Sequence, residues 1–373
     1  MMNGISSLKK TEFMDMDVDQ MSAPQKLIEQ QWEKNLPGEV IRMVEQFIDP
    51  GEFGSLLITD TVDSLDGTPG AEGLDWEGII NHHRLNDIRY VNKFLESANR
   101  RLQLGGYLLG CVETSEYRKE KMMERYPRPA NKVVYGVDYL VKRVWPKLPV
   151  LRRPYFFLTQ GRNRVISEME TYGRLYSCGF RLADSVEANG KLYFLAEKTG
   201  DPDYNTEATY GPFIKLRRVG KNGKIVKVYK LRTMSPYSEY VQQFIYERNG
   251  LGTGAKFKDD PRITSMGHFL RKYWLDELPM LYNWIRGDVK FFGVRPISKH
   301  YFSLYPEEFQ DFRKKFKPGL IPPVYVEIPK CIEDTIDIER RYLQAYEKQP
   351  FLTDLRYTVR AFYNIFIKMV RSH

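Results

Sequence analysis

Two adjacent carboxylates in the second half of the chain are its most distinctive chemical feature. Asp276 and Glu277 stand directly before a Leu-Pro pair, inside a stretch rich in apolar and aromatic residues. Acids in such surroundings are costly unless they are hydrated, paired or bound to a metal ion. Pro279 disfavours helical geometry at Leu278, so the pair is predicted to lie at a helix break. Because arginine-bearing segments follow, the pair could act on a phosphate group through a metal ion.

The same few residues also fit a simpler interpretation. An Asp-Glu-x-Pro string is common, and it is usually a solvated helix start at which the helix dipole favours acids. The motifs around the pair therefore have to decide between the two interpretations.

Length and composition indicate a globular protein of two domains. The chain has 373 residues, of which 42% are hydrophobic and 28% charged, as in folded rather than disordered proteins. Residues 201–373 hold 30 Lys and Arg against 20 Asp and Glu, whereas residues 1–200 hold 27 against 28. The excess of positive charge therefore belongs to the second half, which should prefer anions.

Other features of the chain bear on its location. The three cysteines are far apart and predict neither a disulfide framework nor a metal site. No secretory signal and no apolar stretch long enough to span a bilayer is apparent. We expect a cytoplasmic protein that lies at most on the inner face of the membrane.

The first half is predicted to be an α/β unit preceded by a polar arm at residues 1–36. The unit covers residues 37–200, and a polar, turn-rich segment at Thr199–Thr209 marks the domain boundary. Helical spacing and capping residues predict helices at Asn86–Leu102 and at Ser167–Gly179, the latter with Ser167 as its N-cap and Gly179 as its stop. Predicted strands are Phe53–Thr61, Leu104–Val112, Tyr155–Leu158 and Lys191–Ala196.

This half resembles the back portion of a class I methyltransferase-like domain. The resemblance is carried by the helix–Leu-x-x-Gly-Gly–strand element at Phe94–Val112 and by the unit Arg164–Lys198. It implies a degenerate Rossmann-like fold. The glycine-rich nucleotide loop is missing, because Gly51–Gly54 and Gly67–Gly73 lack the G-x-G-x-x-G arrangement. We therefore expect no methyl transfer.

A basic segment opens the second half. Lys215–Arg232 carries eight Lys and Arg and no acid, and its Lys221–Lys224 stretch is typical of a hairpin turn. A solvated basic hairpin is the simplest interpretation. No helix-turn-helix or RNP-type motif accompanies the segment, so nucleic acid is not an expected partner.

The order of motifs in the second half closely resembles the bacterial sugar transferase family, whose members are monotopic phosphoglycosyl transferases. The resemblance covers about Tyr210 to Arg371 and implies a mixed α/β catalytic domain at residues 201–373. Its motifs are Tyr210-Gly211-Pro212-Phe213, Arg218-Val219-Gly220-Lys221-Asn222-Gly223, Tyr229-Lys230-Leu231-Arg232-Thr233-Met234, Asp260-Pro261-Arg262, Gly267-x-Phe269-Leu270-Arg271, Leu275-Asp276-Glu277-Leu278-Pro279, Asn283, Gly287-Asp288, Gly293-x-Arg295-Pro296 and Lys317-Pro318-Gly319.

The resemblance implies an activity and a role for each acid of the pair. The family moves a sugar-1-phosphate from a nucleotide-sugar to polyprenyl phosphate. Asp276 would be the nucleophile and would form a covalent phospho-sugar enzyme. Glu277 would hold Mg²⁺, which takes few protein carboxylates and several phosphate and water oxygens.

The resemblance also implies which residues surround the phosphates. Guanidinium and ammonium groups bind phosphate oxygens well. The implied cations are Lys230, Arg232, Arg262 and Arg295, the implied supporting residues are Asp260, Asp288 and Pro296, and the implied nucleotide loop contains Pro318 and Gly319. Asp260 and Asp288 fit a role as turn or cap residues equally well.

The chain departs from the family pattern in two places. The hydrophobic, re-entrant helix that normally precedes the Gly-Pro-x-Phe element is replaced by a strand and a polar loop at Lys191–Thr209. Tyr139–Leu158 and Leu355–Val370 combine basic and apolar residues and could contact a membrane surface instead, although a helix packed on its own domain is an equal alternative for the second. After Gly319 the chain continues with Leu320–Tyr325, whose two prolines stiffen the loop.

Two rival functions remain open from the sequence. The protein could be a non-enzymatic scaffold or partner of a glycan-assembly complex, which the missing anchor favours and the retained acid pair disfavours. It could also be a methyltransferase with a basic appendage, which binding of S-adenosylmethionine would reveal.

Overall fold

The computed structural model describes residues 6–9, 36–48, 55–66, 75–204, 211–249 and 260–368. The chain divides into two compact units, one made of Met1–Tyr210 with Pro236–Gln242 and the other of Gly211–Ser235 with Gln243–His373. Most of the predicted polar arm, both glycine-containing loops of the first half and the end of the predicted boundary segment lie outside the described residues.

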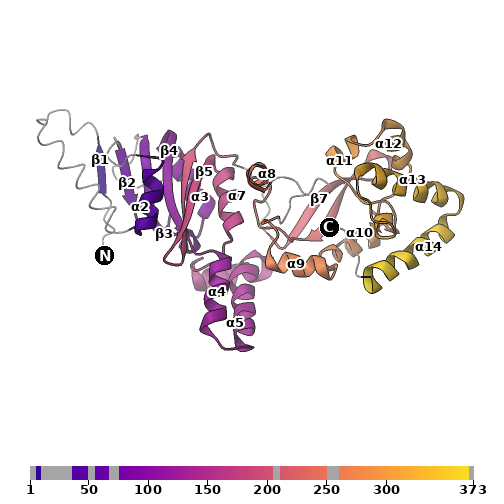
Figure 1. The fold of residues 1–373 in the computed structure, drawn as a ribbon, viewed down its shortest axis with the longest axis horizontal. Coiled ribbons are helices and arrows are strands. Elements are labelled where there is room, and N and C mark those ends of the chain that lie inside the picture. The colour runs from indigo at the N-terminus through magenta and orange to yellow at the C-terminus, as the bar shows by residue number, and fades with distance from the viewer. Residues whose placement is uncertain are drawn as a thin grey trace, which may run out of the picture. The chain divides into compact units, whose positions relative to one another are not determined.

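The first unit is built on a mixed six-stranded sheet (Figure 1). Its strand order is β1-β2-β3-β4-β6-β5; β2, β3 and β4 are parallel, β6 is antiparallel to both of its neighbours, and β1 is antiparallel to β2. The strands are β1 (Ser6–Lys9), β2 (Ser55–Thr59), β3 (Trp76–Arg84), β4 (Leu102–Val112), β5 (Phe180–Ala188) and β6 (Lys191–Lys198). The predicted strands that became β2, β4 and β6 are confirmed, whereas β1, β3 and β5 were not predicted.

Successive side chains of a strand point to opposite sides. Both faces of the sheet therefore carry side chains, and helices cover both faces. Helix α2 (Gly38–Glu45) buries Val40 and Val44 in a cluster with Leu56 of β2 and Ile80 of β3. The alternate residues of these strands are equally buried and face the other side. There α3 (Val91–Arg101) contacts β4 and α7 (Glu168–Ser177).

The helix predicted around residues 167–179 is confirmed together with both of its signals. The Ser167 hydroxyl accepts a hydrogen bond from the Glu170 amide at 3.3 Å, which satisfies a donor at the helix start. Gly179 follows the helix with a φ of 80°, a conformation that costs glycine little. The helix predicted over residues 86–102 is confirmed as α3, preceded by a short turn at Leu85–Asp87.

The segment between β4 and β5 in the sequence forms a helical projection from the sheet. It contains α4 (Ser115–Arg125) and α5 (Ala130–Tyr139), which Figure 1 shows extending below the sheet, and α6 (Pro149–Thr159). The strand predicted at Tyr155–Leu158 is wrong, because these residues lie in α6. Their aromatic character favours a strand, but Pro149 at the helix start and the Arg152-to-Leu148 and Gln160-to-Phe156 backbone hydrogen bonds establish a helix instead.

The second unit combines two small sheets with several helices. The antiparallel hairpin of β7 (Phe213–Val219) and β8 (Ile225–Leu231) turns at Lys221–Gly223, so the predicted hairpin is confirmed. Strands β9 (Lys290–Phe292) and β10 (Gly319–Ile321) pair in parallel. The helices are α8 (Gln242–Asn249), which begins at the last residue of the first unit, α9 (Ser265–Lys272), α10 (Met280–Ile285), α11 (Lys299–Ser303), α12 (Glu307–Lys314), α13 (Ile332–Lys348) and α14 (Pro350–Phe362), which a π turn at Tyr363–Ile367 extends.

Two glycines allow the ends of β9 and β10 to approach closely. Gly293 belongs to the motif that contains Arg295 and Pro296, and Gly319 belongs to the motif that begins at Lys317. A Cβ atom on Gly319 would lie 2.1 Å from the Gly293 backbone nitrogen, and one on Gly293 would lie 2.9 Å from the Gly319 nitrogen. The Gly319 amide donates to the Val294 carbonyl at 2.9 Å. This close approach brings Arg295 and Pro296 beside the residues that follow Gly319.

Candidate active site

Asp276 and Glu277 lie in a tight turn between two helices, as the sequence predicts. The turn, Leu275–Glu277, is a 3-10 helix between α9 and α10. It starts from Trp274, whose φ of 59° is strained for a bulky residue. The Trp274 indole nitrogen donates to the Tyr325 hydroxyl at 3.1 Å. The loop in which the chain departs from the family pattern therefore supports the turn that carries the acid pair.

Glu277 faces cations from two distant segments. The Lys230 ammonium group on β8 lies 2.6 Å from Glu277 Oε1, and both side chains are largely buried. Glu277, Lys230 and Arg295 line one cavity of about 60 Å³, which is far smaller than the sites that enclose a whole nucleotide-sized ligand. The complete lining is Leu216, Arg218, Val228, Lys230, Glu277, Met280, Arg295, Pro296, Leu320 and Pro322.

Arg218 is a cation of this cavity that the sequence prediction of the site missed. Burial, and then the charge of Arg295, lowers the pKa of Arg218. Three cations therefore face one carboxylate, and the arrangement favours an added anion. The hairpin register was the available signal: Leu216 pairs with Val228 and Ile214 with Lys230, so Arg218, two residues beyond Leu216, lies on the face that carries Lys230.

Asp276 sits in surroundings that oppose its charge. Burial is the largest cause of its raised pKa, and the adjacent Glu277 carboxylate is the second. Lys230 and Arg271 act in the opposite direction. Arg271 is held in place because its guanidinium donates to the Thr233 hydroxyl at 2.9 and 3.1 Å.

The other predicted cations are committed to contacts of their own. Arg262 forms a buried ion pair with Asp260 at 2.7 Å, so Asp260 does orient this cation. The Arg262 charge lies near enough to Arg271 to affect its pKa. Arg232 does not line the cavity, and its Nε atom donates to the Gly211 carbonyl at 2.8 Å.

The remaining predicted residues have backbone and packing roles. Asp288 does not orient a cation of the cavity; it accepts from the Asn283 amide at 3.1 Å and lies 3.6 Å from Arg286. The Pro318 carbonyl accepts from the Lys290 amide at 2.8 Å, and Gly319 packs on Gly293. Pro296 lines the cavity.

Asn283 fixes the distance between the two sides of the site. Its side chain is fully buried, accepts from the Tyr229 amide at 2.9 Å and donates to the Lys227 carbonyl at 2.8 Å. These bonds tie α10, which follows the acid pair, to β8, which carries Lys230. They therefore help to set the separation of the ammonium and carboxylate groups.

A buried ion pair positions Arg295. Arg313 on α12 contacts Glu339 on α13 at 2.7 Å, and both side chains are almost inaccessible. The same guanidinium donates to the Arg295 carbonyl at 2.5 Å. The backbone of Arg295 is therefore fixed, and its side chain can take part in the cavity.

The donor atoms of the acid pair suit a hard cation. Mg²⁺ accepts one or two protein carboxylates and completes its shell with water and phosphate oxygens. In the described part of the chain, no group of three or more His, Cys, Asp and Glu could hold a metal by itself. The two adjacent carboxylates, one with a raised pKa, are thus compatible with Mg²⁺ that arrives with a phosphorylated substrate.

A carboxylate pair facing clustered cations has the composition of a phosphate-handling site. Residues 205–368 match the family model described as bacterial sugar transferase. No helix within the described ranges combines the length and the apolar character needed to cross a membrane.

Curated relatives match part of the chain. The galactosyl transferase CpsE of Streptococcus agalactiae is 42% identical over 113 residues, which are 30% of this chain and 25% of CpsE. The undecaprenyl-phosphate galactose phosphotransferase of Salmonella typhimurium is 34% identical over 134 residues, 35% of this chain and 26% of the relative. A putative undecaprenyl-phosphate N-acetylgalactosaminyl 1-phosphate transferase of Bacillus subtilis is 36% identical over 114 residues, 30% of this chain and 57% of the relative. The chain thus spans from a quarter to just over half the length of these proteins.

Replacing Asn283 by leucine should destabilise the second unit. The Tyr229 amide and the Lys227 carbonyl would lose their partners in a buried position, at a cost of about 2–4 kcal/mol. Urea unfolding monitored by tryptophan fluorescence measures the loss. Gln344→Leu, which changes an exposed amide on α13, is the matched control and should shift stability by less than about 0.5 kcal/mol. Equal midpoints for the two variants would contradict the proposed role of Asn283.

Proposed function

We propose that this protein transfers a sugar-1-phosphate from a nucleotide-sugar to polyprenyl phosphate. The observation that carries the proposal is the cavity in which Glu277, next to Asp276, faces Lys230, Arg218 and Arg295. The surrounding region matches the bacterial sugar transferase model, and two relatives are named for undecaprenyl-phosphate chemistry.

The proposed reaction has two displacements at one phosphorus atom. An Asp276 carboxylate oxygen attacks the phosphorus that carries the sugar, the bond from this phosphorus to the bridging oxygen breaks, and the nucleoside monophosphate leaves with the electron pair. A phosphate oxygen of the polyprenyl acceptor then attacks the same phosphorus. The acyl phosphate bond breaks, the Asp276 carboxylate returns and a polyprenyl diphospho-sugar is released. Such a covalent intermediate gives ping-pong kinetics.

The cations of the cavity would hold the substrate phosphates during both displacements. Arg295 and Arg218 offer planar, paired donors, whereas Lys230 offers a point charge. Glu277, with Asp276 beside it, would hold Mg²⁺, which would offset diphosphate charge and stabilise the leaving group. Lys230 already neutralises Glu277 at 2.6 Å, so a bound metal and a bound phosphate would each compete for one partner of this pair.

The names of the relatives support a place at the start of polysaccharide assembly. CpsE is named as a galactosyl transferase, and a second relative, ExoY of Sinorhizobium fredii, is named for exopolysaccharide production. We propose a UDP-sugar as the donor and initiation of exopolysaccharide, capsule or O-antigen synthesis as the role.

One surface of the second unit suits a membrane that contains the lipid acceptor. Helix α14 packs through buried Thr353 and Ala361, so the predicted packing on its own domain is present. Its other side exposes apolar residues next to exposed Arg356 and Arg360. The exposed apolar residues of α14 and its π turn are Phe351, Leu352, Leu355, Val359, Phe362, Tyr363 and Ile367. A basic, apolar helix face of this kind binds anionic lipid surfaces, and we propose that it places the protein on the inner face of the membrane.

For the first unit we propose a degenerate methyltransferase-like fold without methyl transfer. The parallel order β2-β3-β4 with helix α3 as a crossover, followed by the β5–β6 pair, supports this fold. The loops that would bind a nucleotide are outside the described residues.

Replacing Asp276 by asparagine should lower nucleoside-monophosphate release by about a thousandfold or more, since the nucleophile is lost. The assay contains UDP-sugars, Mg²⁺ and undecaprenyl phosphate in detergent, and circular dichroism confirms the fold. Asp311→Asn, an exposed acid on α12, is the control and should remain active. Turnover of the Asp276→Asn variant at the wild-type rate would refute the mechanism. No turnover by the folded wild type with any donor would favour the scaffold alternative.

The acid limb of the pH–rate profile should move when Arg271 is replaced. Attack needs the Asp276 carboxylate, whose pKa is raised, so activity should decline at a higher pH than for an ordinary aspartate. Arg271 lowers this pKa, so Arg271→Gln should raise it and shift the limb to higher pH. Arg271→Lys should largely restore the limb, and Lys272→Gln, an exposed neighbouring cation, should leave it unchanged. A limb that does not move in Arg271→Gln would show that Asp276 is not the titrating group.

Replacing Val359 by glutamate should weaken binding to anionic vesicles by about tenfold or more, because apolar burial is lost and repulsion is added. Flotation with phosphatidylglycerol vesicles measures the change. The control is Ile328→Glu, because Ile328 is 65% exposed and Val359 61%, and both lie in the second unit. Equal flotation of the two variants would argue against α14 as the membrane contact.

A further inference from the structure

The first unit contains a second charged cavity that the proposed reaction does not use. Its volume is about 330 Å³, within the usual range for small-molecule pockets. It lies where β3 and β4 end, because Arg84 is the last residue of β3 and Glu113 follows β4. Ligands of open α/β sheets commonly bind outside the carboxyl ends of parallel strands. The lining is Arg84, Glu113, Arg118, Lys121, Met122, Arg125, Tyr126, Lys142 and Asn163.

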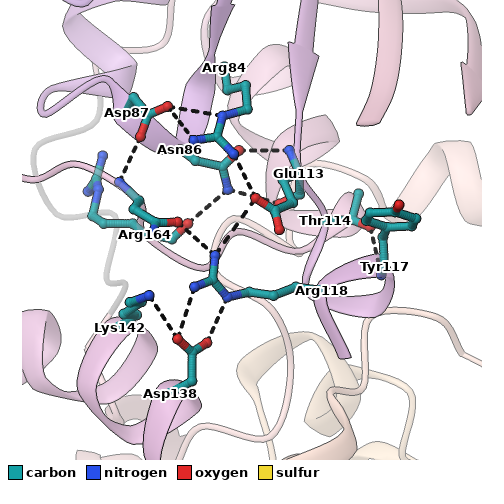
Figure 2. A network of polar contacts seen from close by, with 11 residues as sticks. Arg84, Asn86, Asp87, Glu113, Thr114, Tyr117, Arg118, Asp138, Lys142 and Arg164 are labelled. Carbon is teal, nitrogen blue, oxygen red and sulfur yellow. Dashed lines mark hydrogen bonds and ion pairs between the residues drawn. The ribbon is translucent and has the colours of Figure 1, made fainter. Parts of the chain in front are cut away.

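The inner wall of the cavity is a network of paired charges (Figure 2). Arg84 donates to Asp87 at 2.8 and 3.0 Å and to Glu113 at 2.7 Å. Arg118 donates to both oxygens of Asp138 at 2.7 and 2.9 Å. These bonds satisfy the carboxylates of the wall. The wall therefore presents paired side chains in fixed positions, and none of its described carboxylates is unpaired.

Asn86 holds this wall to the backbone. Its amide donates to the carbonyls of Glu113 at 2.9 Å and Arg164 at 2.8 Å, and its oxygen accepts from the Glu113 amide at 2.7 Å. Asn86 is fully buried. The network therefore explains how the α4–α5 projection is anchored to the sheet. The other residues by which α4 lines the cavity take no part in it.

Helix α4 presents two parallel rows of side chains to the cavity. Lys121 and Arg125 are one helical turn apart, and Met122 of the same helix lies near Tyr126, the extended residue that follows the helix. Among the described residues, neither Lys121 nor Arg125 has a carboxylate partner, and the Arg125 guanidinium lies 5.7 Å from the centre of the Tyr126 ring. One row thus carries unneutralised positive charge, and the other carries apolar and aromatic surface.

We propose that this cavity binds a small phosphate-bearing ligand with a planar ring, of the nucleotide class. Lys121 and Arg125 would bind the phosphate group with charge-assisted hydrogen bonds. Tyr126 and Met122 would cover the ring. Five cations and one carboxylate line the cavity, so an anionic ligand is favoured and a sulfonium ligand such as S-adenosylmethionine is not. This site goes beyond the proposed transfer reaction and lies entirely within the first unit.

Calorimetry on the full chain tests the proposal. The Lys230→Gln/Arg295→Gln background weakens nucleotide binding at the transferase cavity, so that binding by the first unit can be measured separately. Uridine monophosphate, adenosine monophosphate, inorganic phosphate and S-adenosylmethionine are the probes. We expect at least one nucleotide to bind, and to bind more tightly than inorganic phosphate.

Charge reversal then locates the site. Lys121→Glu and Arg125→Glu, made in the same background, should each weaken nucleotide binding by about tenfold or more. Lys119→Glu makes the same change at an exposed position of α4 that does not line the cavity, and it should have little effect. Absence of nucleotide binding, equal affinities for nucleotide and inorganic phosphate, tight binding of S-adenosylmethionine, or equal effects of Lys119→Glu and Lys121→Glu would each overturn the proposal.

Discussion

The buried amide of Asn283 connects the two segments between which the candidate reaction would occur. It binds the backbone of β8 on both sides of Val228, and it lies on the helix that starts three residues after Glu277. Amide bonds of this kind are directional, so they fix position as well as separation. These bonds hold β8 beside the turn of the acid pair, where Lys230 contacts Glu277 at 2.6 Å.

Like charges lie close together in the site, and contacts from neighbouring elements hold them there. Arg218 and Arg295 are close enough to affect each other, and Asp276 and Glu277 are adjacent. The Arg313–Glu339 pair, the close contact of Gly293 with Gly319 and the Trp274–Tyr325 hydrogen bond hold these groups in place from outside the cavity. A substrate that brings both phosphate and a cation would neutralise each set of charges, so the site is arranged for its ligands rather than for stability.

Each unit has a cavity lined by several cations and a carboxylate, although the two folds differ. In the second unit the cations converge on a carboxylate pair that could perform chemistry. In the first unit Arg84 and Arg118 are paired with Asp87, Glu113 and Asp138, whereas Lys121 and Arg125 of α4 have no carboxylate partner among the residues that the structure describes. The first arrangement is the one for which we propose transfer of a sugar-phosphate group, and the second is the one for which we propose ligand binding alone.

The sequence alone determined the features that depend on neighbours along the chain. The hairpin turn at Lys221–Gly223, the capped helix α7 and the break at Leu275–Glu277 follow from local hydrogen bonds and from proline and glycine geometry. The ordered motifs also identified the region that matches the bacterial sugar transferase model. Tertiary structure decided which cations share the cavity, because Arg218, Lys230 and Arg295, which are up to 77 positions apart in the sequence, meet there through strand pairing and the Asn283 bonds.

The same reason explains what the sequence did not determine. Arg218 lines the cavity because of its register in the hairpin, whereas Arg232, in a motif that looks equally catalytic, bonds to the Gly211 carbonyl. Asp288 likewise supports Asn283 rather than a cation of the cavity. The aromatic run at Tyr155–Leu158 lies in helix α6. The preference of aromatic residues for strands depends strongly on context, and here the helix that begins at Pro149 continues through them. Residue types and motif order are properties of the chain, but the partner that each side chain meets is a property of the fold.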